Sequence, residues 1–178
     1  MAVNRTDEYL RPRGYYDNQG NLLKVGFDVI NTLPTSKSNI GYNPSCQVTH
    51  SVNQSVPDSA ITALAFDTVY FDNDAIHNVT NSTRLTCKTA GKYLIHGEIR
   101  FPIAASGIQN IRINKNGVPA AITGTLGNLS MEADLIVSAI ENLSINDRVE
   151  LLAYQSSGSP LNVLTTTYSP KFSMVMIG

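Results

Sequence analysis

Four side chains that are able to bind a cation lie close together in the sequence: Asp67, Asp72, Asp74 and His77. A Ca²⁺ ion takes about six to eight oxygen ligands, and the spacing of these carboxylates does not follow the EF-hand pattern. The alternative is a loop whose side chains accept hydrogen bonds from their own backbone. We favour this second interpretation, and we predict no metal site and no cofactor.

The other reactive side chains are dispersed along the chain. His50, His77 and His96 form no i, i+4 pair, so we expect them at the surface or in an interface, with a pH-sensitive contact as the alternative. Cys46 and Cys87 are too few for a disulfide framework or a metal cage. Two buried free thiols are the favoured interpretation, and a Cys46–Cys87 disulfide is the alternative.

Composition and motifs exclude several classes of function. The sequence has no Gly-x-Ser-x-Gly, His-Glu-x-x-His or Gly-Lys-Ser/Thr motif, so we predict that the protein is not an enzyme. Lys and Arg number 13 against 14 Asp and Glu, without a basic stripe, so we expect no nucleic-acid partner. No run of about 18 apolar residues is present, and the N-terminus lacks an apolar signal region. We therefore expect no membrane span, and we expect synthesis in the host cytoplasm, with a sequence numbered after processing as the alternative.

The elements that must position these residues are short strands. The stretch 84–101 organises the chain, because its second half alternates with period two. Such alternation predicts a strand with one face on a core and the other face mostly in water. The first face comprises Tyr93, Ile95, Gly97, Ile99 and Phe101, and the second comprises Leu94, His96, Glu98 and Arg100.

Other segments repeat this pattern. Residues 109–115 are closed by Asn116-Gly117, the strongest short signal of a hairpin, because a type I′ turn needs a positive φ at both positions. Residues 131–140 alternate again. Residues 172–177 are apolar on both faces, which predicts that a second subunit covers the side away from the core. Eight to ten short strands without a helical period predict an all-β sandwich or barrel.

Residues 1–45 differ from the rest and are too polar and too broken by Pro to bury a core. They are either a flexible tail or an arm that leans on its own subunit, a symmetry mate or another protein. We favour an N-terminal docking arm (1–45) joined to a folded domain (46–178). Because Arg and aromatic residues carry much of the energy of interfaces, we predict docking contacts by Arg5, Arg11, Arg13, Tyr15, Tyr16 and Phe27.

Motifs in residues 46–178 resemble the complement C1q/tumour-necrosis-factor superfamily. Residues 66–72 are similar to its aromatic-Asp strand, and residues 90–95 to its Gly-x-Tyr strand. Residues 143–149 resemble its L-x-x-G-D-x-V turn, with Asn146 where Gly is usual. The remaining matches are the loop Ile76-His77-Asn78, the segment Arg84-Leu85-Thr86, the hairpin Asn114-Lys115-Asn116-Gly117 and the closing strand 172–178.

The resemblance implies a ten-stranded jelly roll that forms a homotrimer, with the Gly-x-Tyr and closing strands near the threefold axis. It assigns the trimer contacts to Tyr93, Ile95, Tyr154, Phe172, Met174 and Met176. Because some members of this superfamily bind Ca²⁺, the resemblance leaves an ion in the loop around Asp72 and His77 as an alternative. A short chain with an N-terminal arm and neither collagen nor a stalk is most similar to the bacteriophage versions.

These features together predict a virion structural protein. We expect a trimeric capsid decoration (cement) protein on the capsid surface, anchored to the major capsid protein of the shell by residues 1–45. The alternative is the tip of a phage fibre or spike that binds a host receptor or surface glycan through loops 102–108, 121–130 and 155–161. A secreted C1q-like ligand is the third interpretation.

Overall fold

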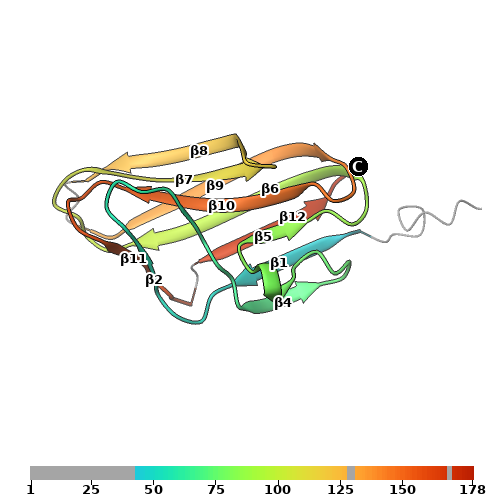
Figure 1. Ribbon diagram of the computed structural model, residues 1–178, viewed down its shortest axis with the longest axis horizontal. Coiled ribbons are helices and arrows are strands. Elements are labelled where there is room, and N and C mark those ends of the chain that lie inside the picture. The colour runs from blue at the N-terminus through green and yellow to red at the C-terminus, as the bar shows by residue number, and fades with distance from the viewer. Residues whose placement is uncertain (1–42, 128–130, 168–169) are drawn as a thin grey trace, which may run out of the picture. The chain divides into compact units, whose positions relative to one another are not determined.

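The computed structural model describes residues 43–127, 131–167 and 170–178, which form one all-β unit (Figure 1). The docking residues predicted in the arm, from Arg5 to Phe27, lie outside the described residues. Within the described part of the chain, no helix is long and apolar enough to span a bilayer.

Two five-stranded antiparallel sheets face each other across the core. In sheet A the strand order is β4 (Thr68–Asp72), β1 (Ser45–Thr49), β12 (Lys171–Met176), β6 (Gly91–Phe101) and β9 (Ala133–Leu143). In sheet B the order is β3 (Thr62–Ala63), β10 (Arg148–Gln155), β7 (Ile108–Lys115) and β8 (Val118–Leu126), and β5 (Arg84–Thr86) also pairs with β10.

The connections between the two sheets are those of a jelly roll. Strands distant in sequence, such as β1 and β12 or β6 and β9, are hydrogen-bonded neighbours. A separate ribbon pairs β2 (Gln54–Val56) with β11 (Leu161–Val163), and one 3-10 turn, η2, covers Val79–Asn81. The predicted all-β sandwich is thus confirmed. The described residues hold twelve strands and not the ten that the resemblance implied, and four of the twelve, β2, β3, β5 and β11, have only two or three residues each.

The core lies between the inward faces of the two sheets, as the alternation predicts. Tyr93, Ile95, Ile99 and Phe101 of β6 are buried, while Leu94 between them is exposed. At Gly97 the sheets approach so closely that an added Cβ would lie 2.5 Å from Leu151 Cδ1. Glycine suits this position because a larger residue would require the buried Leu151 side chain to move.

Two turns adopt the left-handed backbone that their sequences indicate. Asn116 and Gly117 have φ of 52° and 85°, which confirms the hairpin between β7 and β8. Asn146, between β9 and β10, has φ of 71°. Asn tolerates this region better than other residues with a Cβ, so it replaces the Gly that is usual in the resembling motif.

Candidate interaction surface

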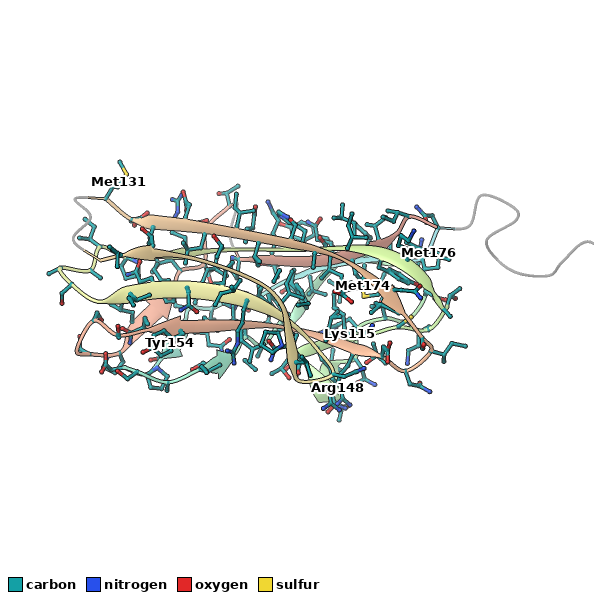
Figure 2. All side chains as sticks on the ribbon, turned by 90° about the horizontal axis from the view of Figure 1, so that it is seen from above. Lys115, Met131, Arg148, Tyr154, Met174 and Met176 are labelled. Atoms are coloured by element: carbon teal, nitrogen blue, oxygen red, sulfur yellow. The ribbon has the colours of Figure 1, made fainter. Side chains whose placement is uncertain are left out.

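Five of the six residues assigned to trimer contacts lie inside a single chain. Tyr93, Ile95, Phe172 and Met174 are fully buried, and Met176 is nearly so. Figure 2 shows Met174 and Met176 at one end of the sandwich and Tyr154 towards the other. The core of one chain thus covers these five side chains, and their assignment to a trimer interface stays a prediction.

Tyr154 lies elsewhere. It is half-buried on β10 of sheet B, between the inward-facing Ala153 and Gln155. The six residues therefore do not form one surface. The resemblance identifies strands, and it does not identify which face of each strand points outward.

The outward face of sheet A carries exposed apolar side chains. Some lie where the alternation predicts contact with water, and others were not singled out by the sequence pattern. Leu94, Ile136, Ile140 and Ile177 are 41%, 58%, 62% and 50% exposed. Val175, Leu94 and Ile140 are register partners across β12, β6 and β9, so they form one row. We call these five residues the apolar face. Residues 172–177 were predicted to be buried on both sides. In the single chain the core buries one side only, and the other side is part of the apolar face.

Polar groups occupy the middle of the same outward face. His96 Nδ1 lies 2.9 Å from Ser138 Oγ, and its Nε2 lies 3.8 Å from a Glu98 oxygen. Lys171 Nζ completes the group at 3.0 Å from the other Glu98 oxygen. These partners neutralise one another locally, so the face as a whole carries little net charge at its centre.

An Arg–carboxylate pair links β6 and β9 next to this group. Arg100 donates from Nε and Nη2 to the two oxygens of Asp134, at 2.6 Å and 2.8 Å, and from Nη1 to Glu132 at 3.2 Å. The hydrogen bond from Arg100 lowers the pKa of Asp134, and in return Asp134 raises the pKa of Arg100. All three side chains are partly exposed, so the pair orients the ends of the strands and adds little stability.

Two edge strands add exposed apolar side chains of different kinds. β4, at one edge of sheet A, exposes Val69, Tyr70 and Phe71. β8, at the edge of sheet B, exposes aliphatic residues instead: Val118, Ile122 and Leu126. An unpaired edge strand with apolar side chains is a surface on which another chain can pack.

The loop around Asp72 is held by its own backbone. The Asp72 carboxylate accepts hydrogen bonds from the backbone N–H of Ile76 at 2.9 Å, His77 at 2.8 Å and Asp74 at 3.3 Å. Asp67 Oδ1 likewise accepts a hydrogen bond from the Ser51 backbone N–H, at 2.9 Å. Among the described residues, no three His, Cys, Asp or Glu side chains are grouped as a metal site would require.

Both cysteines are free and buried in the structure. Burial, with the nearby Asp72 carboxylate, raises the pKa of the Cys46 thiol to about 12, and burial also raises the pKa of Cys87. A thiol that does not ionise near neutral pH is a poor nucleophile and a poor metal ligand. The cysteines therefore act as small core residues.

His50 lines a hollow of about 310 Å³ together with Phe66, Asp67 and Gln54. The imidazole is only 4% exposed and stacks on Phe66, with ring centroids 6.2 Å apart. Burial lowers the pKa of His50, against smaller opposing effects of the Ala65 backbone and Asp67. This histidine is therefore neutral at physiological pH and belongs to the fold, whereas His96 lies on the outward face.

The loops predicted to bind a ligand meet at one end of the sandwich. The backbone N–H of Gly127 donates to Gly107 O at 2.6 Å, and that of Ser156 donates to Ile108 O at 3.0 Å. Met131 and Tyr154 mark this end in Figure 2. Of the predicted loop 121–130, residues 121–126 belong to strand β8 and residues 128–130 lie outside the described residues.

No family profile and no curated protein sequence matches this chain. Many solved structures are similar to it, among them the following two. The globular domain of zebrafish complement 1qA protein matches with a TM-score of 0.51 at 16% identity, over 76% of this chain and 98% of that chain. Murine APRIL, crystallised at pH 5.0, matches with a TM-score of 0.57 at 9% identity, over 76% of this chain and 99% of that chain. At such identities the likeness concerns the fold, which is a jelly roll of the C1q and tumour-necrosis-factor type.

Proposed function

We propose that the protein acts without catalysis, as a module that assembles into a homotrimer and binds other proteins. The observation that carries this proposal is the apolar face of sheet A. Large aliphatic side chains in one row across three neighbouring strands are rare on the surface of a protein that works alone. Covering them with another copy removes apolar area from water, at about 25 cal/mol per Å².

The two unlike edges favour a ring over a twofold dimer. A twofold contact joins the same patch on both copies, whereas a ring joins two different patches head to tail. The aromatic edge at Tyr70 and Phe71 and the aliphatic edge at Ile122 and Leu126 are different patches on one chain. The resemblance to C1q/TNF proteins implies a ring of three copies.

The test uses one double variant of the full chain and a matched control. Leu94→Ser with Ile140→Ser removes two members of the apolar face, and we expect the trimer to dissociate into monomers in light scattering. Val52→Ser with Val79→Ser removes two exposed residues outside sheet A, and we expect the trimer to persist. Dissociation of the control, or persistence of the trimer in the first variant, would contradict the proposed face.

For the setting in which this trimer acts, we propose the surface of a bacteriophage capsid. The proposal rests on the sequence resemblance and on the segment 1–45, which has the Arg and aromatic residues of a docking arm. Clamping neighbouring shell subunits stabilises the assembled state by mass action. A non-enzymatic cement role needs no buried catalytic group, and the perturbed groups described above are all parts of the fold or of surface ion pairs.

Capsid binding is tested by co-sedimentation with shells that lack the protein. We expect the full chain to sediment with the shells as a trimer, and the chain without residues 1–45 to remain trimeric in the supernatant. If neither form binds shells while both are trimers, the capsid role is wrong and the assembly proposal stands.

A ligand-binding module is the second candidate. The observation that favours it is the convergence of loops 102–108 and 155–161 at one end, held by backbone hydrogen bonds. None of the residues in these loops is charged, so recognition there would rely on polar and apolar contacts. A host receptor or surface glycan that binds the protein after deletion of residues 1–45 would favour this candidate over the cement role.

A further inference from the structure

The turn between β7 and β8 contains the only Asn-Gly pair in the sequence, Asn116-Gly117. Both residues have a positive φ, and no atom lies within 4 Å of a Cβ built on Gly117. A glycine that follows an asparagine leaves its backbone nitrogen unhindered, so this nitrogen is able to attack the carboxamide carbon before it. The pair is therefore chemically labile wherever its carboxamide is free to turn.

In the folded chain the carboxamide is not free. Asn116 Nδ2 donates to Asp147 Oδ1 at 2.8 Å, and Asn116 Oδ1 accepts from the Arg148 backbone N–H at 2.9 Å. The Asn116 backbone N–H also donates to Arg148 O, at 2.9 Å. These three bonds join the β7–β8 turn to the β9–β10 turn, and Figure 2 shows Lys115 and Arg148 near each other. We call the three bonds the turn latch.

Asp147 is held in place to serve this latch. Its Oδ2 accepts from the Ser144 backbone N–H at 2.9 Å, and Lys115 Nζ lies 3.8 Å from the same oxygen. The hydrogen bond from Asn116 is the largest of the effects that lower the pKa of Asp147. The acceptor is therefore an ionised carboxylate at neutral pH, and a bond to a charged group is stronger than a neutral one.

We infer that Asn116 is a site of spontaneous deamidation and that the turn latch controls its rate. The Gly117 nitrogen forms a bond to Asn116 Cγ and gives up its proton, while the bond from Cγ to Nδ2 breaks and ammonia leaves. Water then opens the resulting succinimide ring, to give aspartate or isoaspartate. Because ring closure requires the carboxamide to rotate, both of its hydrogen bonds must break first.

The product cannot restore the latch. In aspartate the Nδ2 donor is replaced by a carboxylate oxygen that faces the Asp147 carboxylate, and two like charges in direct contact repel each other. Each local opening of the turn therefore carries a chance of permanent loss of the latch. Local openings of this kind are frequent in turns near the surface.

The experiment follows conversion at residue 116 by peptide mass spectrometry during long incubation of the full chain. We expect slow conversion in the native protein, several-fold faster conversion in Asp147→Ala and the fastest conversion in urea. Asp147→Asn keeps one oxygen acceptor for Asn116 but loses the charge and the acceptor for the Ser144 N–H, so we expect a rate between those of the native protein and Asp147→Ala.

Two results would overturn the inference. One is a native rate equal to the rate in urea, which would mean that the latch protects nothing. The other is a folded Asp147→Ala variant that converts no faster than the native protein. If Asp147→Ala does not fold, the comparison of native and urea-unfolded wild-type chains still decides the question.

Discussion

The two faces of sheet A are built by the same strands and have opposite fates. On the inner face, Tyr93, Ile95 and Phe172 are completely buried by the chain's own second sheet. On the outer face, Leu94 and Ile140 alternate with such residues and stay exposed, although they are equally apolar. Apolar character on the inner face is explained by the fold, and on the outer face we propose that it is explained by a partner.

A candidate assembly surface is recognised by apolar side chains that remain exposed in the single chain. Residues with no remaining accessible surface give no such signal, however near to a symmetry axis their strand lies. The informative residues are the apolar ones at positions where alternation expects polar side chains. The following predictions test the two faces separately, in order of decreasing effect on stability.

The largest effect is expected from truncating an inner residue. Phe172→Ala leaves a cavity beside Phe66, whose ring centroid lies 5.6 Å from that of Phe172, so we expect a loss of about 3–5 kcal/mol in the free energy of unfolding. Ser173→Ala, on the outer face of the same strand, should change it by less than about 0.5 kcal/mol. Urea unfolding of both variants measures the contrast, and similar losses would remove the distinction between the faces.

Two buried glutamines on neighbouring strands test how hydrogen bonding of polar side chains in the interior affects the free energy of unfolding. The Gln155 amide donates to Val56 O at 3.1 Å and to Ser159 O at 2.9 Å and accepts from Ser157 N–H at 2.8 Å. Gln155→Leu leaves these groups unpaired, and we expect a loss of about 2–3 kcal/mol.

Gln109, its register partner, is 1% exposed, and its amide has no hydrogen-bond partner among the described residues. Gln109→Leu should therefore be neutral or raise stability by about 1 kcal/mol, because it removes an unsatisfied polar group. Equal destabilisation by both glutamine variants in urea unfolding would be inconsistent with this assignment.

We expect acid to lower the free energy of unfolding through protonation of His50. Its pKa is lowered in the folded state below the ordinary 6.5, so the unfolded chain binds the proton more readily. The stability is fully present above about pH 6.5 and falls below it, by at most about 1.4 kcal/mol per pH unit for one proton.

Unfolding curves at several pH values between about 4.5 and 7 measure this slope, above the range in which carboxylates titrate. In His50→Gln the contribution of this residue should vanish. An unchanged slope in the variant would assign the acid sensitivity to other groups.

The smallest effect on folding is expected on the outer face. Leu94→Ser should change the free energy of unfolding of the monomer by less than about 0.5 kcal/mol, because the side chain is exposed in a single chain. Its effect should appear in assembly instead, as a weaker trimer in sedimentation velocity. A large loss in the stability of the isolated monomer would place Leu94 in the fold and not in the interface.

Much of the fold was predictable from local rules. The alternation of residues 93–101 identified β6 and its inner face, and Asn116-Gly117 identified the β7–β8 hairpin, because both signals act between neighbours in sequence. The ribbon of β2 and β11 was not predicted, since two strands of three residues carry no period and pair over a long sequence distance. Long-range pairing of short segments leaves no local trace.

The candidate surface was less predictable than the fold. The sequence indicated that strand 172–177 meets a second subunit, but it assigned Met174 and Met176 to the contact, and these are the inward residues. Where both faces of a strand are apolar, as in residues 172–177, a period of two separates the faces without indicating which of them is inside. Ile136 and Ile140 carried a signal that the sequence did offer. They are apolar, although they lie on the same face of their strand as the polar residues Asp134 and Ser138.

Sedimentation equilibrium of the full chain over a range of concentrations measures its mass in solution. We predict a species of three times 19.3 kDa that persists on dilution, because neighbouring copies would cover the apolar face. A single species of 19.3 kDa at all concentrations would contradict it, and the outer face of sheet A would then need a different partner.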